Sequence, residues 1–261
     1  MPSFLITNDD GIQSPMLRPM AEKLGALGPV RIVVPKEEQS WKGKAVTRFG
    51  RVLVERREDF PVETYAVTGT PSDCVNLAVH HLCRPPPDWV VSGINIGSNV
   101  GLGFIVNSGT VGAALEAAFQ GIPAVAFSTY LEPERFRQWN EEKRLTHPES
   151  LRAIETSTSR MAAMMERIVA AGLPAGAMLL NINFPGALTP ETPVRWVPVQ
   201  KNRYGGLFRR EGPGYVHSTQ VGLESEDTGP NDRDVVMGGE ISVTALSFAA
   251  ISLPPGPIIA L

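Results

Sequence analysis

The sequence has few of the residues that mark several common protein classes. It contains only two cysteines and four histidines among 261 residues, and no internal repeat. Its formal net charge of −3 at pH 7 is too small to create a field that attracts nucleic acid or an anionic membrane. Any anionic ligand must therefore be held by local groups, and we expect neither a nucleic-acid partner nor a membrane.

The cysteine positions disfavour a disulfide. Cys74 and Cys83 are nine positions apart within one predicted helix, and about two and a half turns place them on opposite faces. A reduced, cytoplasmic setting is the simpler interpretation. The first residues lack a cationic region and reach two acids by residue 10, which argues against a signal peptide.

Long apolar segments are also scarce. The last 21 residues, 241–261, carry no charge and are long enough to cross a bilayer. Pro254, Pro255, Gly256 and Pro257 argue against a continuous helix there. We expect a buried strand followed by an apolar tail.

What the sequence does contain is a regular alternation of short apolar runs and helical segments. The runs are continuous in Val, Ile and Leu, which is typical of strands buried on both faces. Helices between such strands predict an α/β fold, a Rossmann-like, doubly wound, mostly parallel sheet. The expected strands are 3–7, 30–35, 51–55, 64–69, 88–95, 124–128 and 178–185. The expected helices are one that begins with Ser14 as N-cap and three at 71–83, 108–121 and about 148–172.

The composition changes after about residue 186. The following segment is rich in Gly, aromatic residues and Arg and has no helical period. We therefore expect a single domain, 1–261, with a core at about 1–185 and a C-terminal hairpin extension, an arm, at about 190–235. A return strand and tail would occupy about 240–261.

The segment "NDDG" follows the first predicted strand and places Asp9 beside Asp10. Asn, Asp and Gly are common in turns, so a turn is the ordinary interpretation. The alternative is a metal site, because a cation relieves the repulsion between adjacent carboxylates. Carboxylate, amide and hydroxyl oxygens suit Mg²⁺, Mn²⁺ or Ca²⁺, whereas zinc would require His or Cys.

The loop 35–48, after the second predicted strand, contains Ser40, Trp41 and four cationic residues. A solvated basic loop is the ordinary interpretation. In the functional alternative the hydroxyl completes a metal shell, the cations meet phosphate and Trp41 stacks on a base. The four cations are Lys36, Lys42, Lys44 and Arg48.

Two glycine-containing segments supply an amide and a helix start. They form neither the G-x-G-x-x-G of dinucleotide sites nor the G-K-[ST] of a Walker loop. Asn95 ends a strand, so its amide is expected in the crevice beyond the sheet. Ser108, Gly109 and Thr110 open a helix whose free N–H groups favour an anion, with an ordinary N-cap at Ser108 as the simpler alternative. Together with the acidic pair, these groups fit metal-assisted hydrolysis of a phosphate ester.

Other protein classes also place acids after a first strand. Receiver domains of signalling systems need an acceptor Asp and a Lys at later strand ends, where this chain has "SGIN" and "AFST". Haloacid-dehalogenase phosphatases need Asp at positions i and i+2, but here Asn8 and Asp10 have that spacing. A nucleotide-binding protein without catalytic activity is a third alternative.

Six short motifs occur in order along nearly the whole chain. They are "LITNDDGIQSP" (5–15), "GTPSDCV" (69–75), "SGINIGSNVG" (92–101), "NSGTVGAALEA" (107–117), "LNINFP" (180–185) and "ISVTAL" (241–246). In this combination they resemble the SurE family of survival proteins, which are metal-dependent nucleotidases and phosphatases.

The resemblance implies hydrolysis of the 5′- or 3′-phosphate of nucleoside monophosphates. It also implies one divalent cation per subunit, with Mg²⁺ or Mn²⁺ ahead of Ca²⁺, and a homodimer or homotetramer that exchanges C-terminal elements. The family's metal shell maps onto Asp9, Asp10, Ser40 and Asn95, with Asp9 and Asp10 also as catalytic residues. Its phosphate-binding residues map onto Asn99, Ser108, Gly109 and Thr110.

Some positions differ from the family pattern. Asn107 stands where a Tyr is usual, Trp41 follows Ser40 in place of a Gly, and "VTAL" replaces "VTPL". None of these differences removes a metal ligand. They therefore concern substrate preference more than activity.

Overall fold

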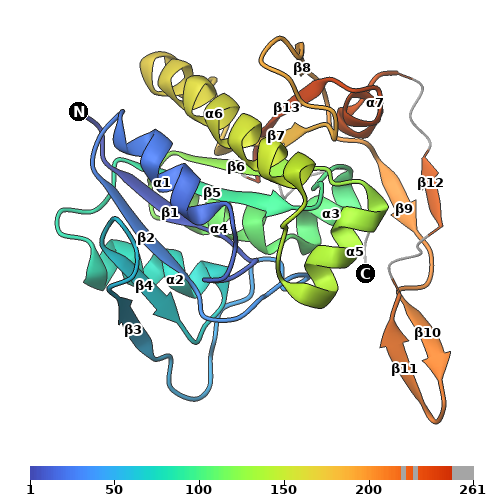
Figure 1. Cartoon of the computed structure of the whole chain (residues 1–261), viewed down its shortest axis with the longest axis horizontal. Helices are drawn as coiled ribbons and strands as arrows, with labels where there is room; N and C mark the ends of the chain where they lie inside the picture. The colour runs from blue at the N-terminus through green and yellow to red at the C-terminus, as the bar shows by residue number, and fades with distance from the viewer. Residues whose placement is uncertain (219–221, 226–228, 249–261) are drawn as a thin grey trace, which may run out of the picture.

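The structure, a computed structural model, describes residues 1–218, 222–225 and 229–248. Its main element is a nine-stranded sheet with the order β3-β4-β2-β1-β5-β6-β7-β13-β8 (Figure 1). The strands from β4 to β7 in this order are parallel, whereas β3 and β13 are antiparallel to their inner neighbours. The predicted mostly parallel sheet is confirmed. The strands are β1 Phe4–Thr7, β2 Val30–Pro35, β3 Val54–Arg57, β4 Thr64–Val67, β5 Trp89–Ile96, β6 Ala124–Thr129, β7 Leu179–Phe184, β8 Val194–Trp196 and β13 Ile241–Leu246.

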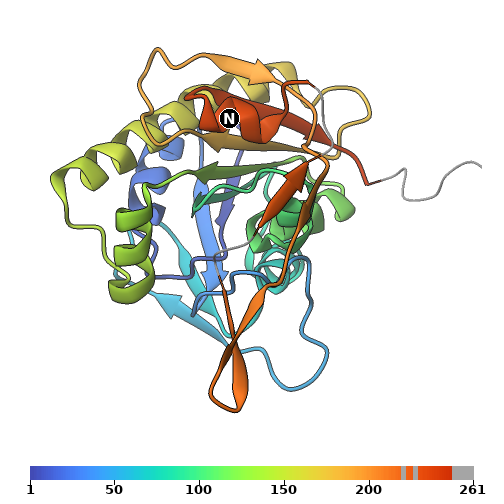
Figure 2. The same cartoon turned by 90° about the vertical axis from the view of Figure 1, so that its right-hand side faces the viewer.

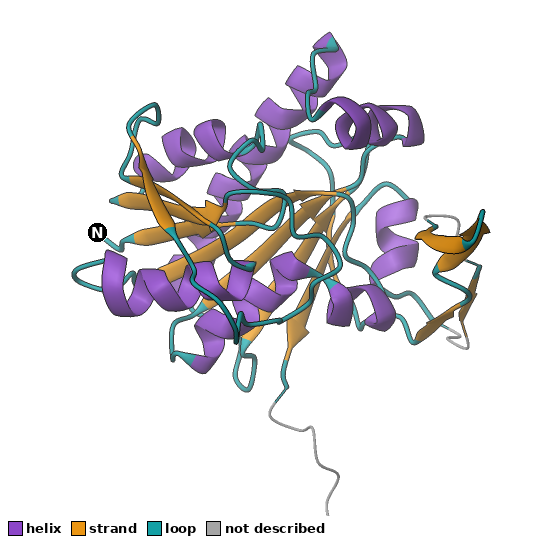
Figure 3. Ribbon diagram, turned by 90° about the horizontal axis from the view of Figure 1, so that it is seen from below, coloured by secondary structure: helices purple, strands orange, loops and turns teal. Residues whose placement is uncertain are grey.

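Helices cover both faces of this sheet (Figure 3). Alternate side chains of β1 point to opposite faces of the sheet. Phe4 and Ile6 pack with α1 and α6, and Leu5 packs with α2 and α4. Burial on both sides explains why the strands are continuous apolar runs. The helices are α1 Leu17–Gly25, α2 Pro71–Leu77 with a π-helical turn η1 Ala78–Leu82, α3 Leu102–Asn107, α4 Gly109–Phe119, α5 Pro133–Glu142, α6 Pro148–Ala171 and α7 Asp232–Met237.

The direction of strand addition reverses beside β1. From β1 the chain adds β2 and β4 on one side, and it later adds β5, β6 and β7 on the other. The loops that leave β1 and β5 therefore diverge, which opens a crevice at the carboxyl ends of these two strands. The acidic pair follows β1, and Asn95 lies near the end of β5.

The chain beyond β7 forms the predicted hairpin extension. β10 Phe208–Glu211 and β11 Gly214–His217 form an antiparallel hairpin that projects from the body of the molecule (Figures 1 and 2). At its base, β9 Asn202–Tyr204 pairs with β12 Leu223–Ser225. β13 returns to the main sheet between β7 and β8, as expected for the return strand, and the predicted tail from 249 lies outside the described residues.

The start of the first helix was predicted wrongly. Ser14 is not its N-cap: α1 begins at Leu17, and Met16 occupies the N-cap position without a side-chain hydrogen bond. Ser14 instead lies in a turn, where its N–H donates to the carbonyl of Gly11 (3.1 Å). The loop after the acidic pair therefore extends further than the Ser-Pro pattern indicates.

The sequence also fails to predict α3, α5, α7 and β8. α3 and α7 have only six residues each, too few to show a helical period. α5 is strongly polar and buries one side chain, Trp139. All three residues of β8 are exposed at the edge of the sheet, so no apolar pattern marks it.

Two further expectations concern the cysteines and the membrane. Cys74 and Cys83 are both free and buried, as the predicted absence of a disulfide requires. Among the described residues, no helix combines the length and the apolar character needed to cross a bilayer.

Candidate active site

A tight turn holds the two acids at the end of β1. The side chain of Asn8 accepts a hydrogen bond from the N–H of Gly11 and donates one to its carbonyl, both at 3.1 Å. Gly11 has a φ of +83°, and a Cβ there would lie 3.0 Å from the backbone of Glu37. This turn leaves Asp9 and Asp10 only 3% and 5% exposed. The turn chemistry and the acidic pair are therefore parts of one arrangement.

Each carboxylate is fixed by a different neighbouring element. Thr110 of α4 donates its hydroxyl to Oδ1 of Asp9 (2.5 Å), and the N–H of Ile96 in β5 donates to Oδ2 of Asp10 (3.1 Å). Gly109 allows α4 to approach so closely, since a Cβ there would lie 2.7 Å from Cβ of Asp9. The helix start and the end of β5 thus orient the acidic pair.

The pair has an unfavourable electrostatic environment. Burial raises the pKa of Asp9, and burial together with the charge of Asp9 raises the pKa of Asp10 well above its ordinary value. The charge of Glu38 adds to both increases. Lys143 lies close enough to lower the pKa of Asp10 somewhat, but it forms an ion pair with Glu38. A bound cation would relieve this concentration of negative charge.

A cavity of about 800 Å³ opens beside the acidic pair. Five of the predicted residues line it, and the other three do not. Of those three, Gly109 and Thr110 contact Asp9, and Asp10 is the next residue along the chain. Its volume is in the range of pockets for small organic ligands. The predicted residues in its lining are Asp9, Ser40, Asn95, Asn99 and Ser108.

Asn95 reaches the cavity because β5 is irregular. The pairing of β5 with β6 shifts register between Ser92 and Asn95. Within the shift, Gly93 approaches the carbonyl of Phe127 so closely that a Cβ would lie 2.1 Å from its oxygen. The Asn95 amide nitrogen donates to the carbonyl of Gly97 (2.6 Å), so the donor end of the amide is engaged and its oxygen is the end available to a ligand.

Ser40 is brought to the cavity by a backbone link between two loops. The carbonyl of Asp9 accepts a hydrogen bond from the N–H of Gln39 (2.7 Å), which ties the loop after β2 to the acid turn. The Ser40 hydroxyl donates to Oε1 of Glu38 (2.8 Å). Its lone pairs remain able to meet a cation, since the bond to Glu38 uses the proton.

Asn99 is held by asparagines of the "LNINFP" motif, a role that the sequence did not predict. Asn183 accepts from the backbone N–H of Asn99 (2.7 Å) and donates to its carbonyl (3.2 Å), and Asn181 donates to the same carbonyl (2.9 Å). The Asn99 side chain donates to Ser128 (2.8 Å). The motif thus positions the loop that carries Asn99.

Ser108 is an ordinary N-cap and also lines the cavity. Its side chain accepts a hydrogen bond from the N–H of Val111 (3.1 Å), so the simpler alternative is confirmed. The N–H of Ser108 donates to the carbonyl of Ile105 (3.3 Å), so the first N–H groups of α4 that an anion could meet are those after Ser108. Anion binding at this helix start stays a prediction.

The donor set fits a hard divalent cation. It consists of two carboxylates, one amide and one hydroxyl, and in the described part of the chain no cationic side chain forms an ion pair with either acid. Within residues 1–218, 222–225 and 229–248, no group of three or more His, Cys, Asp and Glu side chains is arranged to hold a metal. The proposed set has only two acids, so it does not belong to that kind of group.

Comparison with known proteins identifies the family. The model of the family described as "Survival protein SurE" matches residues 4–206. The chain belongs to the SurE family. Curated relatives named "5'-nucleotidase SurE" include one from Methanocella arvoryzae, 38% identical over 73% of this chain and 70% of its own length. Another, from Methanosarcina barkeri, is 31% identical over 95% of this chain and 92% of its own length.

A solved structure agrees with this assignment. The crystal structure of the SurE protein from Aquifex aeolicus is 28% identical to the chain and has a TM-score of 0.72. The match covers 95% of this chain and 94% of that one. The SurE family and the predicted fold class are both confirmed.

The cationic side chains that line the cavity of this SurE-family chain do not come from the loop 35–48, so the functional alternative for the cations of that loop is not supported. None of the four cationic residues in the loop 35–48 lines it, and Lys44, for example, pairs with Glu116 (2.5 Å). Arg137 of α5 and Arg233 of α7 line it instead. Both belong to short helices that the sequence pattern does not reveal, so their place in the site could not be predicted.

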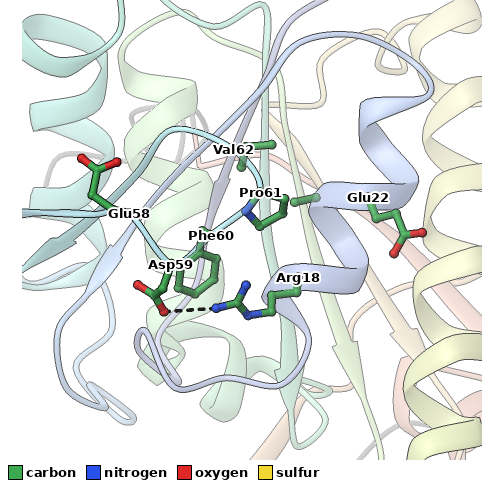
Figure 4. A pocket seen from close by; sticks show the side chains of 8 residues that line it. Arg18, Glu22, Glu58, Asp59, Phe60, Pro61 and Val62 are labelled. Carbon is green, nitrogen blue, oxygen red and sulfur yellow. Dashed lines mark hydrogen bonds and ion pairs between the residues drawn. The ribbon is translucent and has the colours of Figure 1, made fainter.

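A second cavity lies between α1 and the loop that precedes β4 (Figure 4). It has a volume of about 490 Å³ and contains none of the predicted site residues. Arg18 crosses it to pair with Asp59 (3.1 Å) and lies 4.2 Å from the centre of the Phe60 ring. These contacts are typical of a surface ion pair.

Proposed function

We propose that this SurE-family chain is a metal-dependent phosphomonoesterase that hydrolyses nucleoside 5′-monophosphates, and also 3′-monophosphates, to nucleoside and phosphate. The observation that carries the proposal is the buried acidic pair at the edge of a nucleotide-sized cavity. Its partners there are an amide, a hydroxyl and a helix start, which is the set of groups that phosphate-ester hydrolysis requires. The curated relatives with the printed name 5'-nucleotidase support the choice of substrate.

Asp9, Asp10, Ser40 and Asn95 would hold the cation, with Mg²⁺ or Mn²⁺ preferred and Ca²⁺ as the third candidate. A cation in such a site lowers the pKa of a water molecule and neutralises charge that develops on the phosphate. Oxygen ligands from these four side chains suit each of these ions.

The protein's own side chains and amides would activate the attacking water and bind the phosphate. Asp9 lines the cavity, so its carboxylate can orient the attacking water or accept its proton, with Asp10 sharing the charge of the pair. Asn99, Ser108 and the amides of Gly109 and Thr110 would hold the non-bridging phosphate oxygens. Arg137 and Arg233 add positive charge to the cavity wall.

The reaction is proposed to be a direct transfer to water. No phosphorylated enzyme would form, so a substrate with a chiral phosphate should give product of inverted configuration. Two successive transfers would retain the configuration and exclude this scheme.

We also propose that the chain acts as a homodimer or homotetramer in the cytoplasm. Phe208 and Tyr215, large apolar side chains on the projecting hairpin, are mostly exposed, which is typical of a surface that a second subunit covers. The buried free cysteines suit a reducing compartment. Replacing 207–218 with a short Gly-Ser linker should lower the number of subunits per particle, which is obtained from the molar mass measured by light scattering. An unchanged number of subunits would exclude the hairpin from assembly.

The function is tested with purified protein and a panel of phosphomonoesters. Phosphate release from nucleoside 5′- and 3′-monophosphates would be measured with Mg²⁺, Mn²⁺, Ca²⁺ and Zn²⁺, before and after chelation. We expect release with Mg²⁺ or Mn²⁺ that chelation abolishes and added metal restores. Nucleotide binding by calorimetry without phosphate release under any metal would instead indicate a nucleotide-binding protein without catalytic activity.

A further inference from the structure

Trp41 occupies an unusual backbone position next to Ser40. Its φ is +63°, in the left-handed region that side-chain-bearing residues rarely adopt. A bulky side chain in this conformation is strained unless its surroundings hold it in place. Such strained positions are common at functional sites, so the neighbours of Trp41 bear on its role.

The indole is held between two aromatic neighbours. The ring of Phe104 in α3 lies 5.8 Å away in an edge-to-face arrangement, and the ring of His217 in β11 lies 4.8 Å away and tilted. Such pairs stabilise both rings beyond simple burial. The ring of Tyr204 in β9 in turn lies 6.0 Å from that of Phe104, so the hairpin extension also contacts this aromatic group.

In spite of these contacts, Trp41 stays 38% exposed, and it lines the same cavity as Asp9. Phe104 lines that cavity too. A partly exposed aromatic surface of this kind, in the same cavity as the helix start that is proposed to bind phosphate, matches the shape and chemistry of a nucleoside base. Stacking on aromatic side chains accepts every base, because each has a π-face.

We propose that Trp41, supported by Phe104, is the surface on which the base of the substrate stacks. The inference rests on the proposed function, and it adds a specificity-determining residue outside the metal and phosphate groups. Since recognition would come from ring overlap, all bases are accepted, purines best, and phosphomonoesters without a base are the substrates that the site disfavours.

The experiment compares adenosine 5′-monophosphate with ribose 5-phosphate, which share the reacting group and differ in the base. Trp41→Gly is the main variant, because Gly adopts a positive φ without strain and the backbone beside Ser40 can persist. Trp41→Phe restores an aromatic ring. Phe49→Ala is the matched control, since Phe49 is an aromatic residue of the following segment, is 80% exposed and does not line the cavity.

We expect Trp41→Gly to lower the ratio of kcat/KM for the nucleotide over ribose 5-phosphate by about 5- to 150-fold, mainly through KM. Trp41→Phe should recover most of the ratio, and Phe49→Ala should leave it unchanged. An equal loss on both substrates would mean that Trp41 acts on the reacting centre through Ser40, and an unchanged ratio would mean that the base lies elsewhere. Either result overturns the proposal.

A binding measurement separates this proposal from the proposed function. The nucleotide should quench tryptophan fluorescence of the metal-free protein, and Trp41→Gly should remove the saturable part of the quenching. If the wild type releases no phosphate but shows this quenching, the proposed function fails and the stacking surface stands. If it releases phosphate and the quenching is the same in Trp41→Gly, only the stacking surface fails.

Discussion

Replacing Gly109 with Ala tests the close approach that orients Asp9. Gly109 is the first residue of α4, and a Cβ there would lie 2.7 Å from Cβ of Asp9 and 2.9 Å from its Oδ2. Ordinary contacts begin at 3.4 Å, so the helix start and the acid turn must separate by about 0.7 Å. Cβ of Asp9 is fixed to the backbone, and a rotation of the side chain cannot relieve this contact.

The expected effect is large for activity and small for stability. Ala is a better helix former than Gly by about 0.8–1 kcal/mol, which offsets part of the roughly 1–3 kcal/mol that overpacking costs. A displacement of the order of 1 Å in a catalytic group costs about 100-fold in rate, so a 0.7 Å shift should lower kcat/KM by about 10- to 100-fold.

Gly25→Ala provides the matched control. Gly25 ends α1, and a Cβ there meets nothing within 4 Å, so we expect unchanged activity and equal or higher stability. Phosphate release from a nucleoside 5′-monophosphate at saturating Mn²⁺ and the thermal midpoint would be measured for both variants. Wild-type kcat/KM in Gly109→Ala, with a thermal midpoint like that of the control, would refute the reasoning.

Three further predictions concern the loop beside the cavity, proton linkage and the thiols. Asn183→Ala removes two hydrogen bonds to the buried backbone of Asn99 and should lower the free energy of unfolding by about 1–3 kcal/mol in urea titrations, whereas Asn181→Ala removes one and should cost less; equal losses would contradict the assigned roles. Because burial raises the pKa of both acids, a metal must displace protons at lower pH, so calorimetry should show metal affinity that rises with pH and proton release on binding; affinity independent of pH between 4 and 7 would contradict this. Burial also raises the pKa of both cysteine thiols, so a thiol reagent should label the protein only after unfolding; rapid labelling of the native protein would contradict the observed burial.

The parts of the fold that could be predicted are those with a local cause. β2 at Val30–Pro35 coincides with the predicted strand, because a continuous apolar run has one plausible place in a parallel sheet. The Ser108 N-cap and the Asn8–Gly11 turn follow from side chains that bond to their own neighbouring backbone. For the same reason the acids could be placed at a strand end before any long-range contact was known.

The parts that could not be predicted depend on distant segments. Arg137 reaches the cavity only because α5, half of whose residues are charged, lies beside it. Glu38 affects the acidic pair through a loop whose path is set by a backbone bond between Asp9 and Gln39. Contact between the cations of the same loop and phosphate was one of two interpretations, but Lys44 pairs with Glu116 of α4. A sequence pattern carries no information on such pairings between segments.

The central claim is that the acidic pair holds a divalent cation on which phosphate release depends. Asp9→Asn keeps the shape of the side chain and removes its charge, and Asp59→Asn makes the same change at an exposed acid that does not line the cavity beside Asp9. Metal binding by calorimetry and phosphate release from a nucleoside 5′-monophosphate at saturating Mn²⁺ would be measured for both. The account predicts that Asp9→Asn binds the metal more weakly and loses at least about 100-fold in kcat, while Asp59→Asn matches the wild type. Activity of Asp9→Asn near the wild-type level would contradict it.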